Sequence, residues 1–211
     1  EFLRDVCLSP RLFSAQDYSE QIKLMNYNLW KKLPGQIDTD LIYLEQEDVV
    51  ANLLMRYHLG HDTIISRLLT DELWSRAFEK HFDGVTGAFS SKTKHGTTLF
   101  WAIQDGIRKK MIRAGNALVS DDGEYRVLLE PSAIGSAINK KEIMPSMALT
   151  FIVLSFYYGL SCGGGFLQVS YLTAMKDAYC SMLKAVGVDQ DEIDRLAPIK
   201  TDYFCGEFIL G

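Results

Sequence analysis

A long stretch of this sequence contains no charged residue. Residues 143–175 include no Asp, Glu, Lys, Arg or His, and their middle part, Met147–Leu160, is mostly apolar. A membrane-spanning helix needs about 20 consecutive, mostly apolar residues. This run is shorter and leads into Ser161, Cys162 and the triple glycine Gly163–Gly165. The missing charge therefore predicts a buried core element, and no membrane partner is expected.

Cysteine is scarce and widely spaced. The four residues, Cys7, Cys162, Cys180 and Cys205, form no C-x-x-C pair, and no Cys/His spacing is typical of a structural zinc site. The N-terminus lacks the basic and apolar regions of a signal peptide. A cytoplasmic protein with reduced thiols is therefore expected. The sequence begins at Glu1 without an initiator methionine, which is typical of a processed chain or a fragment.

Basic residues are few and scattered, and the formal net charge is -5 with a pI of about 5.4. Nucleic acid is not an expected partner, because affinity for it depends on clustered Lys and Arg. The 211 residues are 47% hydrophobic and 23% charged. This composition is globular, and the length is sufficient for one sizeable core or for a domain with a small subdomain.

Local signatures of named reactions are also missing. The sequence contains no G-x-S-x-G of serine hydrolases, no P-loop and no G-x-G-x-x-G of dinucleotide folds. The nature of any cofactor is therefore unknown from the sequence.

Helical patterns dominate residues 1–84, and strand patterns follow. A helix from Asp17 to Lys32 ends before Leu33-Pro34-Gly35. The next helices are expected at 45–58, at 64–69 after a cap at Asp62 or Thr63, and at 70–82 with Thr70 as cap. Strands are expected at 97–104, 107–113 and 125–129, with turns at Asp105-Gly106 and Asp121-Asp122-Gly123.

The remaining residues are expected to return to helix. The predicted helices are 131–141, beginning at a proline, then the apolar run from 145, then 170–186 and 190–196, with a last strand at 203–210. The apolar run would also suit a buried strand, although its length favours a helix. Helices, then strands, then helices indicate an α+β fold: a helical N-terminal part, a small antiparallel β-meander and a buried helical core. We divide the chain into a helical region, 1–84, and an α+β region, 85–211, which share one core.

The first candidate site follows the apolar run. Glycines 163–165 expose backbone N–H groups to which an anion could bind, and Gln168 and Tyr171 could orient it. Cys162 could act as a nucleophile if its pKa were lowered. The alternative is a tight bend with Cys162 as a small apolar side chain in the core.

The second candidate site is the loop Lys92–Thr98. Lys94 would add positive charge, and His95, at a loop-to-strand junction, is the best placed histidine for proton transfer. The alternative is a solvated loop whose lysines maintain solubility. His58, His61 and Asp62 resemble metal ligands, but Gly60 interrupts their helical spacing and no full ligand set is present, so no metal site is predicted.

These patterns favour a cytoplasmic enzyme that transfers or hydrolyses an acyl or phosphoryl group of a small anionic metabolite. Gly163, Gly164 and Gly165 would bind the anion together with Lys94, Gln168 and Tyr171, and the catalytic residues would be His95 and Cys162. The alternative is a non-catalytic domain of a larger protein that binds a ligand or forms a homo-oligomer through the Phe151–Tyr158 face.

Overall fold

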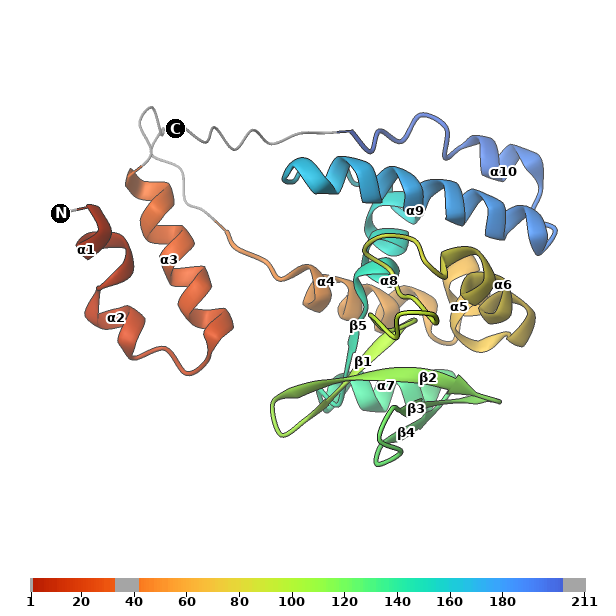
Figure 1. The fold of residues 1–211 in the computed structure, drawn as a ribbon, viewed down its shortest axis with the longest axis horizontal. Helices are drawn as coiled ribbons and strands as arrows, with labels where there is room; N and C mark the ends of the chain where they lie inside the picture. Colours follow the sequence, from red (N-terminus) through yellow and green to blue (C-terminus); the bar gives the residue numbers. More distant parts are fainter. Residues whose placement is uncertain (1, 33–41, 203–211) are drawn as a thin grey trace. The chain divides into compact units, whose positions relative to one another are not determined.

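The computed structural model describes residues 2–32 and 42–202 (Figure 1). The chain divides into two compact units, Glu1–Glu45 and Gln46–Gly211. The strand expected at 203–210 lies outside the described residues. The division at residue 84 that the composition favours stays a prediction.

The first unit consists of three helices: α1 (Phe2–Cys7), α2 (Pro10–Phe13) and α3 (Tyr18–Lys32). The expected helix from Asp17 to Lys32 is present, because Asp17 caps it by accepting a hydrogen bond from the Glu20 N–H (2.8 Å). An ion pair between Lys32 and Asp5 (2.7 Å) joins α3 to α1.

Helices form the first part of the second unit: α4 (Gln46–Leu53), the π-helical turn η1 (Leu54–His58), α5 (Ile64–Thr70) and α6 (Glu72–Phe82). Thr63 caps α5 by accepting from the Ser66 N–H (3.0 Å). The cap predicted for α6 was wrong. Thr70 is the last residue of α5, and Asp71 caps α6 by accepting from the N–H groups of Leu73 and Trp74.

A five-stranded antiparallel sheet follows, in the order β4-β3-β2-β1-β5. Its strands are β1 (Phe100–Gln104), β2 (Ile107–Ala114), β3 (Ala117–Ser120), β4 (Arg126–Leu128) and β5 (Ile143–Pro145). The β1–β2 hairpin turns at Asp105 and Gly106, both with positive φ, as this dipeptide predicts. Strands β3 and β5 were not anticipated.

The last part is helical: α7 (Pro131–Asn139), α8 (Met147–Phe151), the π-helical turn η2 (Ile152–Tyr157), α9 (Phe166–Ala185) and α10 (Gln190–Asp194). The apolar run is therefore helical. Helix α9 begins at Phe166, before the expected start at Ser170 or Tyr171, because Gly165 already occupies the N-cap position.

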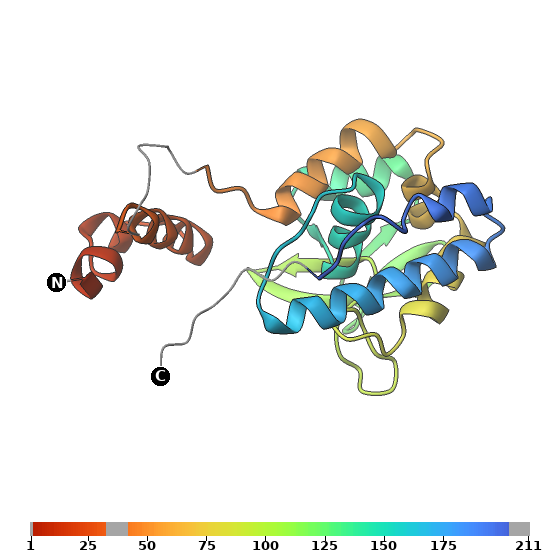
Figure 2. The ribbon, with the colours of Figure 1, turned by 90° about the horizontal axis from the view of Figure 1, so that it is seen from above.

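One hydrophobic core joins these helices to the sheet. The central α8–η2 segment lies between α9 and the sheet, and α4, α5 and α6 surround it (Figures 1 and 2). Residues 151–156 are buried in this core, whereas Tyr157 and Tyr158, at the end of the face considered for subunit contact, are exposed. Across residues 2–32 and 42–202, no helix has both the length and the apolar character needed to span a bilayer. The fold is α+β.

Candidate functional site

The segment between α6 and β1 is an ordered loop held by its own hydrogen bonds. The Gly84 N–H donates to Phe89 O (2.8 Å), and Asp83 accepts from the Ser91 N–H (2.8 Å). Ser90 and His95 exchange two backbone hydrogen bonds, of 2.8 and 3.2 Å. This bridge closes the turn that carries Lys94 and holds His95 at its end.

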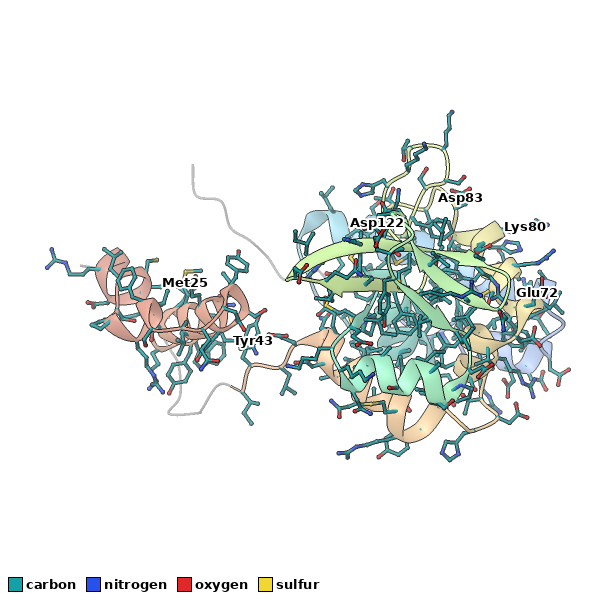
Figure 3. All side chains as sticks on the ribbon, turned by 90° about the horizontal axis from the view of Figure 1, so that it is seen from below. Met25, Tyr43, Glu72, Lys80, Asp83 and Asp122 are labelled. Carbon is teal, nitrogen blue, oxygen red and sulfur yellow. The ribbon has the colours of Figure 1, made fainter. Side chains whose placement is uncertain are left out.

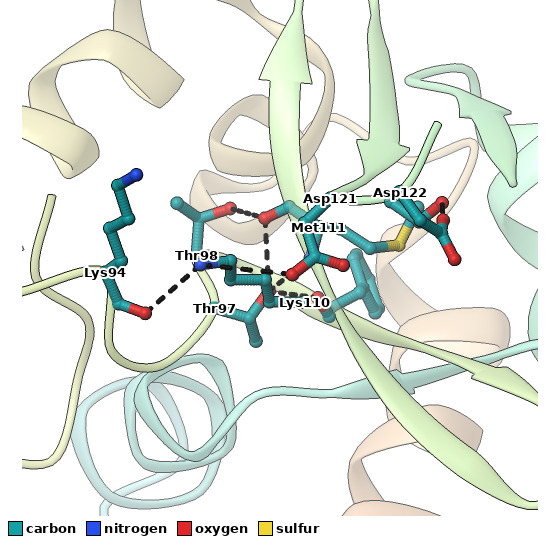
Figure 4. A network of polar contacts seen from close by, with 9 residues as sticks. Lys94, Thr97, Thr98, Lys110, Met111, Asp121 and Asp122 are labelled. Carbon is teal, nitrogen blue, oxygen red and sulfur yellow. Dashed lines mark hydrogen bonds and ion pairs between the residues drawn. The ribbon is translucent and has the colours of Figure 1, made fainter. Parts of the chain in front are cut away.

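Thr97 anchors the end of this loop to β2 (Figure 4). Its Oγ1 donates to Phe100 O (2.6 Å) and accepts from the Met111 N–H (2.9 Å), and the side chain is buried. Nearby, Lys110 Nζ donates to Lys94 O (3.1 Å) and lies 4.0 Å from Asp121 Oδ2. The backbone around His95 is therefore fixed to the sheet on both sides.

Replacing Thr97 by valine should lower the free energy of unfolding by about 2 kcal/mol, because the buried Met111 N–H would lose its acceptor. Chemical denaturation measures the change. The matched control is Thr98→Val, since Thr98 Oγ1 makes only a 3.5 Å contact with Met111 O. Equal losses for the two variants would contradict a special role for Thr97.

A cavity of about 400 Å³ lies between this loop, the sheet and the start of α9. Its lining combines an imidazole, a guanidinium, an indole, a phenol, an amide and a hydroxyl: His95, Arg108, Trp101, Tyr171, Gln168 and Thr150. Two methionines, Met144 and Met147, add apolar surface, and Glu47 contributes one acid. Such a mixture of apolar walls and a few polar groups is typical of small-molecule sites.

Close packing of the loop on α9 forms one wall of this cavity. Gly87 has a φ of +83°, and a Cβ built there would lie 2.9 Å from Met175 Cε and 3.3 Å from Tyr171 Cδ2. A residue with a side chain would be strained at this positive φ, and the end of Met175 would have to shift to make room for it. Gly87 therefore allows the loop to bring His95 to the same cavity as Tyr171.

Gln168 folds back over the glycine turn that precedes α9. Its Nε2 donates to Cys162 O (3.3 Å), and its Oε1 accepts from the Tyr171 hydroxyl (3.4 Å). A Cβ on Gly164 would lie 1.8 Å from Gln168 Oε1, so Gln168 could not keep this position above any other residue. Burial raises the pKa of Tyr171, which keeps its phenol protonated and able to donate.

Thr150 lines the cavity, and its buried hydroxyl has no hydrogen-bond partner among the described residues. The residue is only 3% exposed. Ser146, on the same wall, is satisfied: its Oγ donates to Thr98 O (2.8 Å) and accepts from the Leu149 N–H. An unsatisfied buried hydroxyl costs about 1–3 kcal/mol, so Thr150 is a place where a ligand could bind.

The structure brings only part of the predicted site together. His95, Gln168 and Tyr171 line the 400 Å³ cavity, whereas Lys94 and Gly163–Gly165 do not. Cys162 is also absent from its lining; it is buried and its Sγ accepts a hydrogen bond from Ser155 (3.0 Å).

Sequence reasoning missed Arg108, Trp101 and Thr150. Period-two alternation of the hairpin could have placed Arg108 and Trp101 on its faces, but nothing local points to Thr150. The third candidate, His58, is buried and bonded to Thr63 and Tyr158. Among the residues that the structure describes, no group of three or more His, Cys, Asp or Glu side chains could hold a metal ion.

Comparison with known proteins gives no further guidance. No protein-family model matches the chain, and no curated protein or solved structure shows significant similarity to it.

Proposed function

We propose that the protein binds a small organic anion in the 400 Å³ cavity and catalyses transfer or hydrolysis of its acyl or phosphoryl group. The observation that carries the proposal is that His95, Arg108 and Thr150, whose buried hydroxyl has no partner among the described residues, line one cavity. The guanidinium supplies the positive charge that an anion requires. A reduced, cytoplasmic setting fits the free thiols of Cys162 and Cys180.

Each group has a role in this proposal. Arg108 binds the anionic oxygen atoms, the Thr150 hydroxyl and the Tyr171–Gln168 pair orient the ligand, and Trp101 packs against its apolar part. His95 transfers a proton to the leaving group or accepts one from the attacking nucleophile. Cys162 has no part in this scheme, because its buried thiol lies outside the cavity lining.

Turnover of 4-nitrophenyl acetate and 4-nitrophenyl phosphate tests the acyl and phosphoryl alternatives. We expect wild-type protein to release 4-nitrophenolate from one of them, and His95→Ala to lower kcat by about 100-fold or more. His61→Ala is the matched control, because His61 is exposed and does not line the cavity. An unchanged rate in His95→Ala would overturn the assignment of His95.

The second candidate is a binding function without catalysis. It is favoured because the described residues that line this cavity include no nucleophilic thiol or lysine. The same two probes separate the candidates. Binding of 4-nitrophenyl phosphate that Thr150→Val weakens, without any turnover, would support this second function and contradict the first.

A further inference from the structure

A second cavity, of about 820 Å³, lies between α6 and β2. It shares His95, Gly96 and Thr97 with the 400 Å³ cavity, so the two cavities lie on either side of this short segment. Five cationic and three acidic side chains line it. They are Arg76, Lys80, Lys94, Lys110 and Arg113, and Glu72, Glu79 and Asp83.

Helical spacing explains why the acids face the cavity together. Residues 72, 76, 79 and 83 follow one another at intervals of three or four positions, and Lys80 is next to Glu79, so these side chains lie on one side of α6 and its C-cap. The side chains of Glu72, Lys80 and Asp83 follow one another along this helix in Figure 3. The opposite face of α6 packs Trp74, Phe78 and Phe82 into the core.

Most of these charges already have partners. Glu72 pairs with Arg76 (2.5 Å), Asp83 accepts from Ser91, and Lys110 donates to Lys94 O. Two half-buried side chains, Arg113 on β2 and Glu79 on α6, have groups without a partner. The Nη1 of Arg113 is buried without a hydrogen-bond partner, and the Glu79 carboxylate makes no hydrogen bond or ion pair with any residue in the described ranges, although the Glu79 carbonyl accepts from the Asp83 N–H (3.2 Å).

The geometry of Arg113 is suited to a carboxylate. Arg113 follows Met111 by two positions on β2, so its side chain projects from the same face as this buried methionine. Its Nε donates to Gly115 O (2.9 Å), which fixes the guanidinium plane; on the Nη edge, the buried Nη1 makes no hydrogen bond within the described residues. A carboxylate matches that edge with two parallel hydrogen bonds.

Glu79 makes the site unsuitable for a simple anion. Burial raises the pKa of Glu79, and the positive charges of Arg113 and Arg76 only partly oppose this effect. An added cation would therefore stabilise the charged carboxylate. A ligand for both groups needs a carboxylate beside an ammonium. We propose that the 820 Å³ cavity is a second binding site, for a free α-amino acid whose carboxylate binds Arg113 and whose ammonium group binds Glu79.

Calorimetric titration of the full chain with each common proteinogenic amino acid tests this site. We expect at least one amino acid to bind. Its N-acetyl derivative should bind at least about tenfold more weakly, and Arg113→Met should lower the affinity for the free amino acid by a similar factor. Lys80→Met is the matched control: it removes a cation from the same cavity and should change affinity by less than about threefold.

Glu79→Gln keeps the shape of the side chain and provides a second measurement if Arg113→Met fails to fold. In this variant, the preference for the free amino acid over its N-acetyl derivative should disappear. Thr150→Val should leave amino acid binding unchanged, which separates this site from the 400 Å³ cavity. Failure of every amino acid to bind, equal binding by Arg113→Met, or a preference retained in Glu79→Gln would overturn the proposal.

Discussion

Replacing Gly96 by alanine should lower the free energy of unfolding by about 3 kcal/mol. Gly96 has a φ of +73°, and its added Cβ would lie 2.3 Å from Ala88 O and 3.0 Å from Phe89 Cα. Both neighbours are backbone atoms that cannot rotate away. The left-handed conformation alone costs a residue with a side chain about 1–2 kcal/mol. The steric overlap adds to that cost.

Gly84→Ala is the matched control for this prediction. Gly84 lies in the same loop with a φ of +82°, but no atom lies within 4 Å of its added Cβ. The free energy of unfolding of Gly84→Ala should therefore fall only by the cost of the left-handed conformation, about 1–2 kcal/mol, in the same denaturation experiment. If both variants lost the same amount, the approach of Gly96 to the Ala88–Phe89 backbone would have no energetic role.

Gly96→Ala should also impair both cavities, because residues 95–97 form the wall between them. A displaced backbone would move the His95 imidazole and the acceptor that Thr97 provides for Met111. Binding of 4-nitrophenyl phosphate and of an amino acid should then weaken in the same variant. Gly84→Ala should leave both unchanged, since Gly84 lines neither cavity.

Elements with strong local signals could be predicted from the sequence. The Asp105-Gly106 turn, the proline at the start of α7 and the periodic helices α3 and α6 each depend on residues within one or two turns. Strand β5 was missed because its three residues are too few for a periodic pattern. It forms only through pairing with β1, in which Phe100 lies opposite Pro145.

The cavity could not be predicted as a whole, because no short motif spans it. His95 and Tyr171 are far apart in the sequence and come together where the loop packs against α9 at Gly87. The charge-free stretch did indicate a buried element, and Thr150 lies within it, but burial alone does not show which hydroxyl lacks a partner. The glycine turn also has another explanation: Gly164 provides space for Gln168.

His58 joins two π-helical turns, which are rare in proteins. It is the last residue of η1, and its Nε2 lies 3.1 Å from the hydroxyl of Tyr158, the residue that follows η2. Its Nδ1 lies 3.0 Å from Thr63 Oγ1, and its ring stacks edge-on against Tyr157. The side chain is 1% exposed. Loss of water lowers the pKa of His58 to about 4, and the positive charge of His61 acts in the same direction.

This burial should make the protein less stable in mild acid. The unfolded chain binds a proton at His58 near pH 6.5, whereas the folded chain binds it only near pH 4. The unfolded state therefore holds more protons between these values, and the free energy of unfolding rises with pH across the window. The contribution is complete above pH 6.5 and decreases by about 3 kcal/mol as the pH falls to 4.

Urea denaturation from pH 4 to 7.5 measures this effect, with His58→Gln as the test variant. Glutamine cannot be protonated, so the variant should lose the part of the pH dependence due to His58 while keeping the part due to carboxylates. His61→Gln removes an exposed histidine that only adds to the pKa shift of His58, and it should retain most of the wild-type slope. A wild-type slope in His58→Gln would mean that His58 is protonated in the folded protein. In that case the contacts between η1 and η2 would not require a neutral imidazole.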